Sequence, residues 1–288
     1  MPALDPKLFA LGVAFCFGLN PILLKMGFGR GGSPDVGLMV GLIVALPVYA
    51  VLLPLAGGLQ MELVTVPALV GYVLGGLLGS GIGRRWQYIA IDLIGAAPAS
   101  AIKNSAPVFT AVLAMIFFQE AIAPLQWLAI LAIVVGVLLI SWKPGRPLRS
   151  WFDVGVLVAI AAAGAYGIRP LVLKFGLEAA ELPLTAAIFG AIAALSYALL
   201  AGDRTGLRTI GRDPAFPLFV GAGILQAFGF LSLNMGLVGG DVSVVYPVTS
   251  SAPLFTLVFT WLFLRGRETL TWRIIVGAIA VVAGVVFL

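Results

Sequence analysis

The sequence predicts an all-α integral membrane protein of ten transmembrane helices, arranged as two inverted five-helix repeats. Three observations support this fold class: an apolar composition, a series of apolar runs of membrane length, and motifs that occur twice. Of the 288 residues, 61% are hydrophobic and only 10% are charged, whereas about 25% charged residues is usual in soluble domains. Such a chain has more apolar surface than its own core can hide, so we expect lipid to be its solvent.

Two sequence motifs occur once in each half of the chain. Residues 18–28 have the sequence GLNPILLKMGF, and residues 167–177 have the similar sequence GIRPLVLKFGL. Residues 105–110 have the sequence SAPVFT, which returns as SAPLFT at residues 251–256. A duplicated apolar unit is typical of secondary transporters that are built from two repeats around a central site.

Apolar runs of about 20 residues, bounded by glycine, proline or charged clusters, define the spans. In chain order they are residues 8–27, 35–56, 67–91, 96–118, 124–142, 153–174, 182–201, 214–237, 242–264 and 271–288. Tight turns are predicted at Gly95 and at Gly239–Gly240, where two pairs of spans nearly touch in sequence. Residues 1–142 thus form the first repeat, 143–152 the inter-repeat loop, and 153–288 the second repeat. Because five is an odd number, the second repeat enters the membrane from the opposite side.

The distribution of positive charge predicts the orientation. Lys7 is the one basic residue in the loops on the terminus side, while the loops after odd-numbered spans, with the adjoining start of the last span, contain Arg30, Lys143, Arg146, Arg149, Arg204, Arg208, Arg212, Arg265, Arg267 and Arg273. By the positive-inside bias, both termini lie on the non-cytoplasmic side of a bacterial-type plasma membrane. These loop charges also explain the net charge of +5, so no nucleic-acid partner is expected. The lipid bilayer and a small-molecule substrate are the expected partners, for a monomer or a homodimer.

Several kinds of chemistry are disfavoured by the composition. The chain has no histidine and a single cysteine, Cys16, which leaves no histidine relay, disulfide framework or thiolate metal cluster. The twelve acidic residues do not cluster as a metal or acid–base site would require. We therefore expect no cofactor, no metal and no enzymatic activity. The N-terminal segment is predicted to be the first retained span rather than a signal peptide.

Together the repeated elements resemble the EamA repeat of the drug/metabolite transporter superfamily. Besides the two motifs, a glutamate and a later glycine follow in each half, as Glu120 with Gly136 and Glu268 with Gly284. Two features depart from the pattern: Phe17 stands where the family has tryptophan, and Glu268 lies two residues farther from its motif than Glu120. The resemblance covers nearly the whole chain. It implies the fold of an EamA-type permease and says little about the substrate.

Charged residues inside the predicted spans are all basic. They are Lys25, Arg84, Arg85, Lys103, Arg169 and Lys174, whereas the acidic residues fall in loops or at span ends. A charge at the bilayer centre costs at least ~2.5–3.5 kcal/mol on insertion scales, so such a residue is expected to face a wet cavity or a partner. The candidate substrate-binding residues are Arg84, Arg85, Tyr88, Lys103, Asn104, Arg169 and Asn20. Tyr88 and Asn104 share helical faces with these cations, and Asn20 is the first-repeat equivalent of Arg169.

The expected depths group these cations. Arg84, Arg85 and Lys103 should converge in the cytoplasmic half of the cavity, with Arg169 in the outer half. Adjacent arginines point about 100° apart on a helix, so at most one of the pair should aim at the site. A pair between Arg85 and Asp92, seven residues apart, is the structural alternative for Arg85.

Other polar and small residues have structural interpretations. Lys25 and Lys174 lie near span ends, where lysine side chains can extend to the headgroups, and Lys174 is close in sequence to Glu178 and Glu181. Polar residues that share no face with a cation, Gln226 and Asn234 among them, are interpreted as interhelical hydrogen-bonding groups. A stripe of glycines every four residues along the third span is interpreted as a helix-packing surface, formed by Gly71, Gly75, Gly79 and Gly83.

A basic cavity without carboxylates favours an anionic cargo, because guanidinium groups bind carboxylate or phosphate oxygens in a bidentate fork. The sequence thus predicts a secondary transporter that moves a small polar metabolite by alternating access, as facilitated diffusion or exchange. Two alternatives stay open: export of amino acids or related zwitterions, and flipping of a lipid-linked anion. A sealed, compact cavity would favour a soluble metabolite over the lipid.

Overall fold

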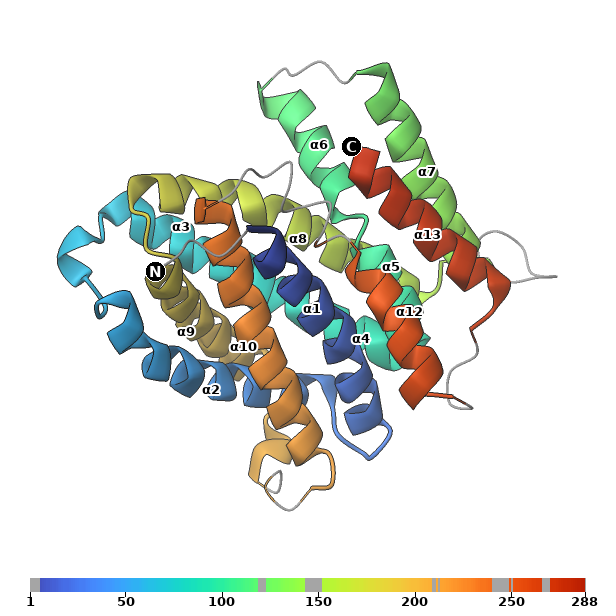
Figure 1. Cartoon of the computed structure of the whole chain (residues 1–288). Coiled ribbons are helices and arrows are strands. Elements are labelled where there is room, and N and C mark those ends of the chain that lie inside the picture. The colour runs from blue at the N-terminus through green and yellow to red at the C-terminus, as the bar shows by residue number, and fades with distance from the viewer. Residues whose placement is uncertain are drawn as a thin grey trace.

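The computed structural model describes residues 6–118, 123–142, 152–208, 211, 213–239, 249, 251–265 and 270–287. Its elements are helices, packed as a bundle (Figure 1). The main helical segments are α1 (Pro6–Phe28), α2 (Pro34–Leu52), α3 (Val66–Gly76), η3 (Leu77–Gly83), α4 (Arg84–Ile94), α5 (Ala96–Lys103), α6 (Ala106–Phe118), α7 (Pro124–Ser141), α8 (Val154–Ala179), α9 (Pro183–Ala201), α10 (Phe216–Gly239), α12 (Ala252–Phe263) and α13 (Trp272–Phe287). Shorter turns are η1 (Leu53–Ala56), η2 (Met61–Leu63) and η5 (Thr205–Arg208).

The helical membrane fold agrees with the sequence prediction. Within the described ranges, six helices are long and apolar enough to cross a membrane. They correspond to the first, second, third, sixth, seventh and eighth predicted spans, while α7, α12 and α13 are shorter apolar helices. The inter-repeat loop at residues 143–151 lies outside the described residues, as do Glu120, Glu268 and most of the first part of the span predicted at 242–264.

Prolines and short polar side chains explain where several helices begin. Ser33 precedes α2, and its hydroxyl accepts a hydrogen bond of 3.3 Å from the Val36 N–H. The Thr65 hydroxyl does the same for α3, and the Asp153 carboxylate does so for α8 at 3.0 Å. Such caps satisfy backbone donors that the first helical turn leaves unpaired. The span boundaries predicted from composition therefore coincide with local start sites for helices.

The third predicted span is one helical run, Val66–Ile94, with an irregular centre. Its middle seven residues, Leu77–Gly83, form a π-helix between α3 and α4. Glycines on this run let backbones of the other repeat approach closely: a Cβ at Gly71 would overlap Gly176 of α8, and one at Gly76 would overlap Gly190 of α9. The packing interpretation of the glycine stripe is confirmed at Gly71. The π-helix was not predicted; such segments occur mostly as single-turn bulges inside α-helices and are frequent at functional sites.

The fourth predicted span, 96–118, is occupied by two helices with a break between them. Helix α5 ends at Lys103 and α6 begins at Ala106, with Asn104 and Ser105 in a turn. Pro107 explains the break, because it has no N–H to donate to the Lys103 carbonyl four residues earlier. The repeated motif has the same local hydrogen bond in both halves: Val108 N–H to the Ser105 carbonyl, and Leu254 N–H to the Ser251 carbonyl.

Helices of the two repeats pack against one another rather than in separate halves. Helix α1 packs along α10 and α12, α2 along α9 and α10, and α3 along α8 and α9. At one side of the bundle α7 packs along α13 (Figure 1), where Gly136 and Gly277 leave room for each other's backbone. The middle of the molecule is therefore built from both repeats, and any site there receives side chains from each.

Loops that follow three odd-numbered spans meet at one end of the bundle. The Arg30 guanidinium donates to the Pro214 carbonyl at 3.1 Å. The Lys25 ammonium, near the end of α1, donates to the carbonyls of Ile91 and Asp92 at 3.0 and 2.6 Å. This arrangement is what alternating spans require, since successive odd-numbered loops must lie on the same side.

Candidate functional site

Two arginines from opposite repeats share one aromatic ring at the centre of the bundle. Arg84 begins α4 and Arg169 lies in α8, and their guanidinium carbons are 5.0 and 4.5 Å from the centroid of the Phe230 ring on α10. Arg84 is 3% exposed and Arg169 is 8% exposed. The sequence had separated these two residues by depth, with Arg84 beside Arg85 and Lys103. The structure instead brings Arg169 to Arg84.

Lys103 joins this group through two more aromatic rings. Its ammonium lies 5.0 Å from the Tyr166 ring centroid and 5.7 Å from that of Phe17. The Phe17 ring in turn packs edge-on against Phe230 at 5.2 Å between centroids. Three cations thus surround a connected set of aromatic faces, with Lys103 placed at the break between α5 and α6.

A small cavity lies between Arg84 and Arg169. Its volume is about 20 Å³, which is room for roughly one water molecule. The polar side chains that line it, among the described residues, are Tyr49, Tyr72, Ser80, Arg84, Arg169 and Asn234, and none of them is acidic. We call this space the Phe230 cavity. Any ligand larger than water requires the surrounding helices to part.

The π-helix shapes the cavity from one side. Ser80, in its middle, accepts a 3.1 Å hydrogen bond from Nη2 of Arg84. Gly79 leaves the space that the Arg169 side chain occupies, because a Cβ at this position would overlap the Arg169 Cδ. The glycine stripe therefore does more than pack helices: one of its members makes room for a buried cation. Nε and Nη1 of Arg84 are buried without a hydrogen-bond acceptor in the described part of the chain.

Three other sequence candidates lie near this group without lining the cavity in the residues described. The Asn20 side chain donates to the Ala222 carbonyl at 2.7 Å and so ties α1 to α10. Tyr88 is 2% exposed and packs beside Phe28, with 6.4 Å between ring centroids. Asn104 is half-buried in the turn that follows Lys103.

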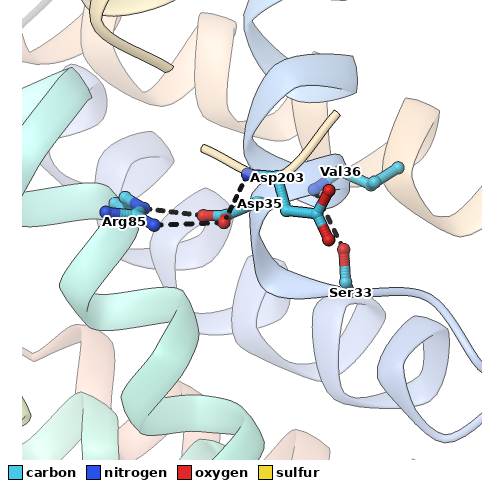
Figure 2. A network of polar contacts seen from close by, with 5 residues as sticks. All are labelled: Ser33, Asp35, Val36, Arg85 and Asp203. Atoms are coloured by element: carbon cyan, nitrogen blue, oxygen red, sulfur yellow. Dashed lines mark hydrogen bonds and ion pairs between the residues drawn. The ribbon is translucent and has the colours of Figure 1, made fainter. Parts of the chain in front are cut away.

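Arg85 has a different environment from Arg84. Its Nε and Nη2 lie 2.6 and 3.1 Å from the two carboxylate oxygens of Asp35, and Asp35 also accepts from the Asp203 N–H at 2.9 Å (Figure 2). We call this set of three residues the Asp35 junction. The pairing of Arg85 with Asp92 is therefore wrong, because the carboxylate that reaches Arg85 comes from the start of α2. Arg85 does not belong to the cavity lining that the described residues form.

The Asp35 junction extends into the loop after α9. The Thr205 N–H donates to the Asp203 carboxylate at 2.9 Å, and this hydrogen bond lowers the pKa of the Asp203 carboxyl. The junction thus connects α2, α4 and the 203–205 loop, which belong to both repeats. A bidentate arginine–carboxylate pair of this geometry restricts orientation as well as adding energy.

The lysines that occupy equivalent positions in the repeats differ as well. Lys25 donates to the last carbonyls of α4, where a positive charge also interacts favourably with the helix dipole. Lys174 is exposed and lies 3.6 Å from Glu178, one of the two acidic residues that are close to it in sequence. Exposed pairs of this kind are worth ~0–1 kcal/mol. Both lysines have structural partners here, although Lys25 binds a helix end rather than headgroups.

Sequence reasoning missed the aromatic and polar groups that complete the site. Phe17, Tyr166 and Phe230 could not be distinguished from ordinary apolar core residues. One pattern was available: Gln226, Phe230 and Asn234 lie four residues apart and so share a face of α10. In the described ranges, no group of three histidine, cysteine or acidic side chains could hold a metal ion.

Comparisons with known proteins agree with this architecture. The model of the EamA-like transporter family matches residues 7–142 and 153–288, one copy in each half. An uncharacterised protein of Pseudomonas aeruginosa is 30% identical over 150 residues, which are 52% of this chain and 50% of that protein. The match thus spans about half the length of that relative. A solved crystal structure aligns over 96% of this chain and 94% of its own, with a TM-score of 0.57 and 18% identity, which shows a shared fold.

Proposed function

Because this chain belongs to the EamA-like transporter family, we propose that it is a secondary transporter for a small polar metabolite with a carboxylate, phosphate or other anionic group. Transport proceeds by alternating access, as facilitated diffusion or exchange. In this proposal, ten spans in two inverted repeats cross a bacterial-type plasma membrane, with both termini on the non-cytoplasmic side. The protein transports its substrate as a monomer or a homodimer and needs no cofactor.

One observation supports the proposal that the substrate is anionic. Arg84 and Arg169 converge on the Phe230 ring in a buried cavity whose described lining has no carboxylate. A desolvated cation–π contact is worth about 2 kcal/mol, while burying an unpaired ion costs several kcal/mol even after relaxation. The aromatic ring alone therefore leaves the charge of Arg84 under-compensated, since its Nε and Nη1 have no acceptor in the described part of the chain. An anion bound between the two guanidinium groups would supply the missing charge and several hydrogen-bond acceptors.

The origin of the two arginines suggests how binding and movement are coupled. Arg84 belongs to the first repeat and Arg169 to the second, so an anion that contacts both links the repeats. Since the Phe230 cavity has room for roughly one water molecule, a metabolite enters only when the helices part, and closes the site by drawing the two guanidinium groups together. The π-helix beside Arg84 is a suitable place for this rearrangement.

The residues have different roles in this mechanism. Arg84 and Arg169 bind the anionic group, and Lys103 with the neighbouring Asn104 contacts the part of the ligand that extends toward the helix break. Asn20, Tyr88 and Arg85, which were sequence candidates, hold helices in place around the site through the contacts described above. The compact cavity favours a soluble metabolite over a lipid-linked anion, because a lipid tail would need an opening toward the bilayer.

Thermal unfolding of the purified full-length protein tests the proposal. The ligand panel is phosphate, methanesulfonate, acetate, glycine and tetramethylammonium, applied to the wild type and to an Arg84→Gln, Arg169→Gln variant. An anion at 100 times its dissociation constant should stabilise the wild type by about 2.7 kcal/mol, and the double variant should show no shift. Lys174→Gln is the matched control, because it removes a charge that is exposed. Stabilisation by tetramethylammonium alone, or anion stabilisation that survives in the double variant, would refute an anion site here.

A further inference from the structure

A buried amide lies one helical turn from the shared aromatic ring. Asn234 is 2% exposed, lines the Phe230 cavity and follows Phe230 by four residues on α10. Its Nδ2 donates to the Pro183 carbonyl at 3.1 Å. A carbonyl can only accept, so this contact fixes which end of the amide faces Pro183. The Oδ1 atom is the other end, and it is buried without a donor among the described residues.

The cavity therefore has unmet hydrogen-bonding groups of both kinds. Nε and Nη1 of Arg84 are buried donors without an acceptor in the described ranges, and Oδ1 of Asn234 is an acceptor without a donor. Buried polar groups in native proteins almost always have hydrogen-bond partners, and leaving such a hydrogen bond unmade is costly. The Arg84 donors and the Asn234 acceptor do not pair with each other, since none of these atoms has a partner in the described part of the chain.

We infer that Asn234 recognises a hydrogen-bond donor on the transported anion. The inference rests on the proposed function and narrows it: the cargo carries an O–H or N–H group near its anionic group, as a 2-hydroxy acid, a 2-amino acid or a hydroxylated phosphate ester does. The anionic group occupies the guanidinium side of the cavity. Asn234 follows Phe230 by about one helical turn, ~5–6 Å along α10, and the donor on the ligand bonds to its Oδ1 atom.

The chemistry makes Asn234 a specificity-determining residue. A site built to accept a hydrogen bond discriminates strongly against the analogue that lacks the donor, because binding the analogue leaves the buried oxygen unpaired. A bare carboxylate satisfies the arginines and leaves Oδ1 of Asn234 alone. The competing explanation is that an ordered water fills the cavity and satisfies both groups, in which case no such discrimination arises.

Matched ligand pairs distinguish these explanations. Apparent dissociation constants for the full-length protein are measured by thermal-shift titration with L-lactate and propionate, and with glycerol 3-phosphate and propyl phosphate. The wild type should bind the hydroxylated member of each pair at least about tenfold more tightly. Asn234→Leu should reduce this preference to less than about threefold while propionate and propyl phosphate still bind. Gln226→Leu is the matched control, because Gln226 is a buried amide on the same face of α10, one turn on the other side of Phe230.

The outcomes separate the two proposals. Equal affinities within each pair for the wild type would overturn the inference and leave the anion site standing, as would a preference that persists in Asn234→Leu. If no anion binds the wild type, the proposed function fails and this inference with it. Should Asn234→Leu fail to fold after losing the bond to Pro183, Asn234→Gln retains an amide displaced by one methylene. A preference unchanged in Asn234→Gln would also count against the inference.

Discussion

The Phe230 cavity and the Asp35 junction hold two consecutive arginines in opposite electrostatic situations. Arg84 is 3% exposed and contacts an aromatic face and one hydroxyl, whereas the Arg85 side chain is 24% exposed and has both oxygens of a carboxylate. Successive residues on a helix point about 100° apart, so one step along α4 separates the cation that we propose binds the ligand from one that pairs with a carboxylate. A cation that pairs with a carboxylate, such as Arg85, holds helices together. A buried cation with unused hydrogen-bond donors, such as Arg84, is available to a ligand.

The largest expected effect concerns Arg169 in the Phe230 cavity. Arg169→Gln should weaken anion binding by at least about 100-fold, because one of two convergent guanidinium groups is lost. Thermal stability without ligand should change little, since the variant removes a buried charge together with the desolvation cost of burying it. Binding isotherms and thermal unfolding on the same preparations measure both quantities. A variant that binds anions normally, or that unfolds several degrees earlier, would place Arg169 among the structural residues.

The next largest expected effect concerns the Asp35 junction. Asp35→Asn should lower the free energy of unfolding by about 1–3 kcal/mol, because Arg85 loses a charge-assisted, bidentate partner. Anion affinity should change less than about threefold. Adding Arg85→Gln should recover part of the lost stability, as a double-mutant cycle in thermal unfolding would reveal. A large loss of anion affinity in Asp35→Asn would show that the junction and the cavity are one site.

A smaller expected effect concerns Gly79, beside the Phe230 cavity. Gly79→Ala should weaken anion binding by about tenfold, because the added methyl group displaces the Arg169 side chain from the Phe230 ring. Gly12→Ala is the matched control, since a Cβ at Gly12 meets nothing within 4 Å. There the substitution should be neutral or stabilise α1 by up to ~1 kcal/mol. Equal binding by the two alanine variants would separate Gly79 from the position of Arg169.

The smallest effect concerns the exposed pair on α8. Lys174→Gln should change the free energy of unfolding by less than about 0.5 kcal/mol, because both Lys174 and Glu178 are largely exposed. Lys25→Gln, its first-repeat counterpart, should cost about 1 kcal/mol or more, since the last carbonyls of α4 lose their charged donor. Equal stabilities of the two variants in thermal unfolding would contradict the different contacts of these equivalent lysines.

Sequence reasoning succeeded where short stretches decide the outcome. The repeated motif around Pro107 and Pro253 indicated equivalent local structure in both halves, and the same serine-centred hydrogen bond is present in each. Glu178 and Glu181 were both close enough in sequence to pair with Lys174, and the structure has the pair with Glu178, four residues away on the helix. Pro107 lies just after the break that follows Lys103, and its missing N–H is a local reason for that break.

Long-range partners were beyond the sequence. Asp35 precedes Arg85 by fifty residues, and nothing along the chain distinguishes it from Asp92, which has the more convenient spacing. Phe230 is one of 18 phenylalanines, and its role depends on two arginines from other helices. Asn234 looked like an ordinary interhelical group, and half of that interpretation is correct, because its Nδ2 does bond to another helix.

By itself, the sequence determined the membrane class, the two repeats, the family and the small set of intramembrane cations. These follow from composition, periodicity and local motifs, because transfer to lipid and helix formation depend on residues close together in the chain. Only the tertiary structure decided that Asp35 pairs with Arg85, while Arg84 packs against Phe230. These partners depend on helix rotation and on contacts between residues far apart in sequence. Arg84 and Arg85 therefore have different partners although they are adjacent in the chain.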